Sequence, residues 1–187
     1  MWKAEAQVLK LSGLEEKEMK VYEVPIWDGI VAIRTTEVGF PSDESNKKPK
    51  LVFMHGFQGS GALFFELFKP LQQHFHCYFV DIVGMGCSGR PAYDKNQSPQ
   101  KLVDYFMSFF EEWRATCNIS GFYLAGHSFG GYICSLYSIR FPQHVKKLML
   151  ISSIGLMQKP EDFDVKRVSV VTMRDKDGKA VENKGPP

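Results

Sequence analysis

Hydrophobic and polar residues alternate near the start of the chain in the way that half-buried strands do. The segment KVYEVPIWDGIVAIRTTEVG contains two runs of β-branched and aromatic residues, separated by Asp28 and Gly29. Because an Asp-Gly pair favours the tight turn of a hairpin, these runs predict two antiparallel strands that open the domain. A polar, proline-punctuated loop follows, and then the wholly apolar LVFMHG predicts a strand that is buried on both faces.

Beyond this strand, helical and strand patterns take turns. A first apolar face at helical spacing is formed by Phe64, Leu67, Phe68 and Leu71. Residues 98–118 predict a long amphipathic helix with Ser98 as its N-cap and with Glu111 and Glu112 outside its apolar face. A further helix is predicted at GGYICSLYSIRF, and buried strands are predicted at HCYFVDIV, GFYLAG and KKLMLISS.

This alternation predicts an α/β fold with a mostly parallel sheet, an N-terminal antiparallel hairpin and helices on both faces. We expect residues 1–153 to form this domain. Residues 154–187 are charged and contain one apolar run, from Val168 to Met173, so we expect a polar tail that is partly disordered.

Charge and composition exclude several classes of protein. The net charge of +2 is nearly balanced and the basic residues are interspersed with acids, which argues against a nucleic-acid partner. No apolar run is long enough for a transmembrane segment, and the amino terminus resembles no signal peptide. Four widely spaced cysteines form no metal-binding pattern. We therefore expect a cytoplasmic protein, or one peripheral to lipid surfaces, with no metal or cofactor.

Three glycine-rich turns follow the buried strands, and two of them have competing interpretations. HGFQGSG, at residues 55–61, lacks the Lys-Ser or Lys-Thr pair that a phosphate-binding P-loop requires. GMGCSG, at residues 84–89, matches the dinucleotide fingerprint, but Pro91 disfavours a helix where one should begin. The acid expected about 20 residues later is also missing, because Asp104 lies inside the amphipathic helix. Nucleotide binding is therefore disfavoured at both turns.

The third turn, Gly126 to Gly130, matches G-x-S-x-G and places Ser128 between a predicted strand and a predicted helix. This setting is typical of a nucleophile elbow, where a side chain two residues before or after the serine would clash with a neighbouring element. The backbone N–H of Phe129 and that of Phe57, in the first glycine-rich turn, are the candidate donors of an oxyanion hole.

The order of five segments along the chain resembles the α/β-hydrolase fold: HGFQGSG, DIVGMGCSGRP, EEWR, GHSFGG and YSIRFPQHVKKLMLISSIGL. More narrowly, residues 21–156 are similar to a lipid-metabolic abhydrolase subfamily that includes lysophospholipases and a lipase co-activator. The resemblance implies that Ser128 attacks carboxylic esters, including those of lipids. It also implies that His55 and Gly56 shape the oxyanion loop and that His127 belongs to the elbow. Some members carry asparagine in place of the nucleophile, whereas this chain keeps Ser128.

The fold requires an acid and then a histidine after the serine. Asp175, at the end of the apolar run in the tail, is the acid candidate. The histidine after the elbow, His144, is expected on the surface, roughly 18 Å away at the other end of a helix. His127 cannot easily turn back onto its neighbour, so His55 is the histidine expected near the site. We therefore expect a C-terminally truncated fold without its lid and last strands.

Two hypotheses remain open. The chain is a serine hydrolase of lipid or small esters, impaired by the missing acid and histidine. Alternatively, it is a non-catalytic binding or scaffold subunit, whose protein partner covers the apolar sheet edge that absent strands would leave open.

Overall fold

The structure is a computed structural model that describes residues 2–41, 47–92, 94 and 96–156, together with two short strands further on. Met1 to Leu156 form one compact unit, and Met157 to Pro187 form a second. Within the second unit, β7 (Met173–Arg174) pairs with β8 (Ala180–Val181) in antiparallel fashion. Residues 168–172 and Asp175 lie outside the described residues.

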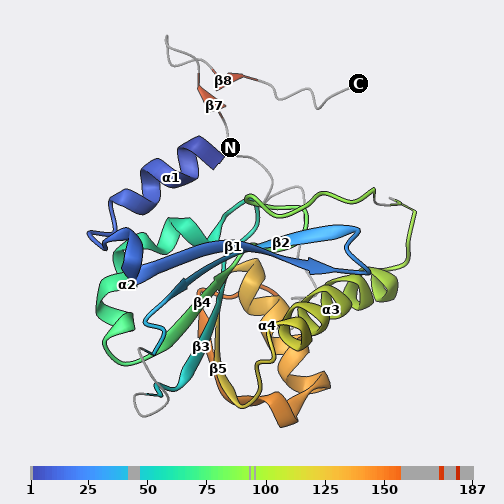
Figure 1. The fold of residues 1–187 in the computed structure, drawn as a ribbon. Coiled ribbons are helices and arrows are strands. Elements are labelled where there is room, and N and C mark those ends of the chain that lie inside the picture. The colour runs from blue at the N-terminus through green and yellow to red at the C-terminus, as the bar shows by residue number, and fades with distance from the viewer. Residues whose placement is uncertain are drawn as a thin grey trace. The chain divides into compact units, whose positions relative to one another are not determined.

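A six-stranded sheet runs through the first unit in the order β1-β2-β4-β3-β5-β6 (Figure 1). The first pairs, β1 with β2 and β2 with β4, are antiparallel, and the remaining pairs are parallel. This confirms the predicted fold class. The strands are β1 (Met19–Ile26), β2 (Val31–Val38), β3 (Lys50–Met54), β4 (His76–Val80), β5 (Phe122–His127) and β6 (Val145–Ile151).

Helices cover both faces of the sheet because alternate residues of its strands point to opposite sides. On one face, Val52 and Met54 of β3 share a core with the inner sides of α3 (Pro99–Thr116) and α4 (Phe129–Arg140). On the other face, Leu51 and Phe53 pack with residues of α1 (Trp2–Lys10) and α2 (Phe65–Gln72). A short 3-10 helix, η3 (Gly61–Phe64), leads into α2.

The expectation that the hairpin opens the domain was wrong. The domain opens on helix α1, whose Leu9 is buried in the core, and this helix is too short to show a clear period. Glu111 and Glu112 lie beside the buried residues of α3 and are half-buried. Glu112 accepts a hydrogen bond of 2.7 Å from the N–H of Trp27 in the hairpin turn. Glu112 thus links α3 to the hairpin turn through this hydrogen bond.

Strand β6 forms an edge of the sheet within the described part of the chain. Its apolar side chains are poorly covered, with Met149 at 53% exposure and both Leu148 and Leu150 also exposed. Exposed apolar edges of this kind are uncommon on the surfaces of single domains. In the same described residues, no helix is long and apolar enough to span a membrane.

Candidate functional site

Ser128 lies in the sharp turn between β5, which ends at His127, and α4, which begins at Phe129. Its backbone has φ of 52° and ψ of −117°, which is a strained conformation for a residue with a side chain. The Ser128 N–H donates to the carbonyl of Ile151 at 3.0 Å, and its carbonyl accepts from the N–H of Tyr132 at 3.2 Å. Neighbouring elements therefore hold the turn in this conformation, while the hydroxyl is not used to cap the helix.

The glycines on either side of Ser128 sit where backbone segments touch. A Cβ atom on Gly126 would lie 2.6 Å from the carbonyl oxygen of Gly130. A Cβ atom on Gly130 would lie 2.6 Å from the carbonyl oxygen of Met54 in β3. Both distances are shorter than real Cβ contacts, so a side chain at either position requires the backbone to move.

The loop after β3 comes directly against this turn. A Cβ atom on Gly56 would lie 3.0 Å from the Cβ of Ser128, and the ring of Phe57 meets that of Phe129 edge-on with centroids 6.3 Å apart. Phe57 is 68% exposed. Among the described residues, no protein group accepts a hydrogen bond from the backbone N–H of Phe57 or Phe129. The structure thus brings the sequence-predicted donors to the same side of the sheet as Ser128.

His55 is a buried anchor of this loop, with 1% of its surface exposed. Its Nε2 accepts the N–H of Ile82 at 2.9 Å, so its Nδ1 carries the proton and donates to the carbonyl of Gly56 at 2.7 Å. Burial lowers the pKa of His55 to about 4, although the bond to Gly56 opposes that shift. Both ring nitrogens are committed to backbone groups, and His55 therefore has no free nitrogen to act as a base.

The other sequence-predicted histidines are also turned away from the Ser128 hydroxyl. The ring of His127 meets that of Phe64 edge-on at 6.1 Å. His144 comes just before β6 begins, at the opposite edge of a parallel sheet from the end of β5. It is half-buried rather than on the surface as expected, because it lies between Glu111 and Ser120, with Nδ1 3.3 Å from the Ser120 hydroxyl. No histidine in the described part of the chain makes a hydrogen bond with the Ser128 hydroxyl.

Asp81, at the end of β4, joins the loops that flank the site. One of its oxygens accepts the N–H of Gly61 at 2.6 Å, and the other accepts the N–H of Cys87 at 2.7 Å. Burial raises the pKa of Asp81 to about 6, and these two hydrogen bonds lower it only in part. Asp81 has no predicted role among the sequence motifs. The signal was available, however, since an acid directly after a buried strand requires hydrogen-bond partners.

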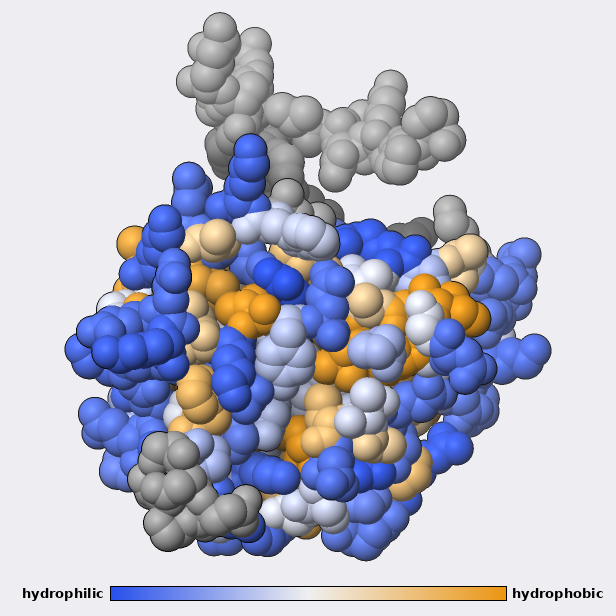
Figure 2. Space-filling model, in the orientation of Figure 1, coloured by the Kyte–Doolittle hydropathy of each residue, from blue (hydrophilic) through white to orange (hydrophobic). Residues whose placement is uncertain are grey.

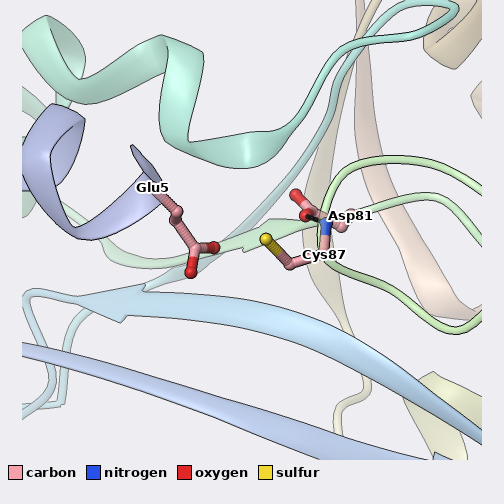
Figure 3. Close-up of side chains that lie close together, drawn as sticks. All are labelled: Glu5, Asp81 and Cys87. Carbon is pink, nitrogen blue, oxygen red and sulfur yellow. Dashed lines mark hydrogen bonds between the residues drawn. The ribbon is translucent and has the colours of Figure 1, made fainter. Parts of the chain in front are cut away.

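Glu5, Asp81 and Cys87 lie together with potential metal-ligand atoms within 4.8 Å of one another (Figure 3). Their chemistry favours a structural role. Glu5 is paired with Arg34, whose Nη2 lies 2.6 Å from a carboxylate oxygen, and Asp81 is occupied by backbone donors. Burial raises the pKa of the Cys87 thiol to about 11, so the free thiol is protonated at neutral pH. The pair between Glu5 and Arg34 attaches helix α1 to β2, and the bonds of Asp81 join the loops that follow β3 and β4.

Comparison with known proteins identifies the family. Residues 49–172 match the family model of the alpha/beta hydrolase fold. The chain belongs to the alpha/beta hydrolase family. A carboxylesterase from Bacillus subtilis illustrates the shared fold: its superposition has a TM-score of 0.67 at 23% identity and covers 81% of this chain and 48% of that one. A bacterial membrane phospholipase A superposes with a TM-score of 0.66 at 26% identity, over 85% of this chain and 47% of the other.

Relatives of this chain carry lipid-related names. A probable 1-acylglycerol-3-phosphate O-acyltransferase of Oryza sativa is 38% identical over 66% of this chain and 29% of its own length. The human (lyso)-N-acylphosphatidylethanolamine lipase is 35% identical over 64% of this chain and 34% of its own. The chain thus spans about a third of the length of these relatives.

Proposed function

We propose that the chain contributes the nucleophile and oxyanion hole of a serine-type enzyme that acts on carboxylic esters of lipids. The observation that carries this proposal is the backbone of Ser128, which holds a positive φ in a strand-to-helix turn with its hydroxyl unused by the helix. Strain at a non-glycine residue is costly and persists where function requires it. This conformation is the one that a nucleophile elbow needs.

In the proposed reaction, Ser128 Oγ attacks the ester carbonyl carbon and loses its proton to a base. The carbonyl π bond opens, and the resulting oxyanion accepts hydrogen bonds from the N–H groups of Phe57 and Phe129. Collapse of this intermediate breaks the bond to the alcohol, which leaves with a proton, and an acyl-serine remains. Water then releases the acid, or a second alcohol takes the acyl group.

The base must come from outside the described residues. His55 is held by backbone groups, His127 packs on Phe64, and His144 lies at the opposite edge of the sheet. Asp175 remains the acid candidate and lies outside the described residues. A serine hydroxyl without a base is a weak nucleophile, so we expect slow rather than absent attack by Ser128 on the ester.

The lipid substrate class is supported by the names of the relatives and by the surroundings of Ser128. Two characterised relatives are named for acylglycerol phosphate and N-acyl phosphatidylethanolamine. Phe57 and Phe129 pack together beside the serine, and Phe129 also meets Phe106 of α3 edge-on at 5.2 Å. Aromatic walls of this kind suit an acyl chain better than a charged substrate.

An esterase assay tests the proposal. Purified chain is mixed with short-chain nitrophenyl esters and with lysophospholipid, and acid release is compared between wild type and Ser128→Ala. We expect slow release that Ser128→Ala abolishes. Equal rates for the two proteins, with both shown to be folded by circular dichroism, would refute a role for Ser128.

The exposed edge at β6 favours a second candidate, a non-catalytic subunit that binds a partner protein. Leu148, Met149 and Leu150 present apolar surface on a strand whose outer edge pairs with no other strand in the described part of the chain. Size-exclusion chromatography with light scattering separates the candidates. A scaffold subunit should associate with itself or with a partner, and a stable monomer with Ser128-dependent esterase activity would exclude this second function.

A further inference from the structure

A partly open apolar cavity lies between α3 and α4, beside the turn that contains Ser128. Its volume is about 130 Å³. It is lined by Pro99, Leu102, Val103, Phe106 and Met107 of α3 and by Phe129, Tyr132, Ile133 and Leu136 of α4. The Tyr132 hydroxyl is the one polar side-chain group in this lining. The cavity therefore suits a hydrocarbon.

Two contacts connect this cavity to Ser128. Phe129 follows Ser128 in the chain, lines the cavity and packs its ring on Phe106 at 5.2 Å. Tyr132 also lines the cavity, and its N–H holds the carbonyl of Ser128 at 3.2 Å. A chain bound here would therefore begin one residue from the proposed nucleophile.

A second cavity, of about 310 Å³, lies on the far side of Leu102 and Phe106. Both side chains line both cavities, so they form the wall that separates them. The second cavity also touches the loop after β4 at Val83, Met85 and Pro91. Hydrophobic residues gather on the side of the molecule along which α3 runs (Figure 2). Phe106 is thus positioned to set the depth available to a chain that enters between α3 and α4.

We propose that the cavity between α3 and α4 binds the acyl chain of the ester, and that Phe106 limits the length of that chain. This inference rests on the proposed role of Ser128. An apolar cavity of about 150 Å³ holds one benzene molecule, so the cavity here accommodates about six carbon atoms. A longer chain fits only where Phe106 turns aside and opens the second cavity. The preferred acyl group is therefore hexanoyl-sized.

Binding of straight-chain carboxylates tests the proposal without requiring any reaction at Ser128. Affinities are measured by calorimetry from butanoate to dodecanoate, with wild type and three variants. We expect the affinity of wild type to peak near hexanoate. Leu136→Trp fills the cavity and should weaken hexanoate binding about tenfold or more, since each buried methylene contributes about 0.8 kcal/mol. Ile139→Trp, on the exposed side of the same helix, should bind like wild type.

Phe106→Ala tests the wall in the opposite direction. It joins the two cavities and should move the peak from hexanoate to decanoate or dodecanoate. If Leu136→Trp does not fold, this gain for longer chains still decides the question. An unchanged chain-length profile in Phe106→Ala, or equal weakening by Leu136→Trp and Ile139→Trp, would overturn the proposal.

The same variants separate this proposal from the role of Ser128. Alkyl fluorophosphonates of increasing length are used to measure the rate of modification of the serine. If Ser128 reacts at rates that ignore both chain length and Leu136→Trp, the cavity proposal fails and the proposed function stands. If carboxylates bind with the expected profile while Ser128 stays unmodified, the cavity is a ligand site and the proposed function fails.

Discussion

The N–H of Ile82 donates a hydrogen bond of 2.9 Å to Nε2 of His55. This bond links the loop after β3, which carries Phe57, to the end of β4, beside Asp81. It also fixes the imidazole as the neutral tautomer that donates from Nδ1 to the carbonyl of Gly56 at 2.7 Å. His55 is thus a structural residue beside the proposed oxyanion hole, and its loss should affect folding before it affects chemistry.

His55 should make the fold sensitive to acid. Its folded pKa of about 4 lies below the ordinary 6.5, so protonation favours the unfolded chain. Its contribution is fully present above pH 6.5 and is lost as the pH falls towards 4, by about 3 kcal/mol for a shift of this size. Urea denaturation of Asp81→Asn between pH 7 and pH 4 should show this loss, because the variant lacks the opposing effect of Asp81.

Asp81 should show the opposite trend. Its folded pKa of about 6 lies above the ordinary 3.8, so the ionised carboxylate costs stability above pH 6 and that cost disappears as the pH falls to 3.8. The effect is again about 3 kcal/mol. As the pH falls from 7 to 4, the free energy of unfolding of His55→Gln should therefore rise, whereas in wild type the loss at His55 offsets this gain. Identical pH profiles in wild type and both variants would contradict the burial assigned to these groups.

Gly130→Ala should destabilise the protein strongly, because its Cβ would press on the backbone of β3 at Met54. Overpacking of this kind costs about 1 to 3 kcal/mol, and backbone atoms cannot rotate away. The matched control is Gly13→Ala, where no atom lies within 4 Å of the new Cβ. There the positive φ alone should cost about 1 kcal/mol. Thermal denaturation that ranks Gly13→Ala as the more damaging change would contradict the packing of the turn.

Tyr137→Phe should remove a part-buried hydrogen bond between α3 and α4. The Tyr137 hydroxyl donates to Glu111 at 2.5 Å, and hydrogen bonds to charged groups contribute about 1.5 to 3 kcal/mol. Tyr123→Phe serves as the control, since no hydrogen bond of its hydroxyl is found among the described residues. Chemical denaturation should show a clear loss for Tyr137→Phe alone. Equal losses would show that the bond to Glu111 adds nothing.

Met149→Lys should reduce association through the β6 edge, because a charge on an exposed edge strand opposes pairing with another chain. Light scattering across a concentration series measures the effect. Ile139→Lys removes an even more exposed apolar residue from α4 and should leave association unchanged. A smaller effect for Met149→Lys than for Ile139→Lys would place the association elsewhere.

The sheet and its main helices could be predicted from the sequence because their patterns are local. Asp28 and Gly29 predict the hairpin turn between β1 and β2. Ser98 predicts the start of α3, where its side chain accepts a hydrogen bond from the N–H of Lys101. The apolar runs predict the buried strands. Helix α1 could not be predicted, because its place depends on tertiary contacts such as the ion pair between Glu5 and Arg34. Hydrophobic periodicity and turn signals do not show which residues far apart in the sequence come into contact.

The candidate site was predicted only in part for the same reason. The glycine spacing around Ser128 announces a tight turn, and the structure shows such a turn. Whether a histidine reaches the Ser128 hydroxyl depends on the orientation of its side chain in the fold, which the spacing of residues along the sequence does not determine. His55 lies on the expected loop, yet both of its ring nitrogens make hydrogen bonds with backbone groups. These bonds are visible only in the three-dimensional structure.

Modification of the intact chain by a fluorophosphonate, followed by mass spectrometry of its peptides, tests directly whether Ser128 is a nucleophile. We expect a single adduct on the peptide that contains Ser128, formed slowly and lost in Ser128→Ala. The control variant Ser138→Ala changes a serine on α4 whose hydroxyl is bonded to the carbonyl of Cys134, and it should react like wild type. Folded protein that carries no adduct, or an adduct on another serine, would contradict the claim that Ser128 is a nucleophile.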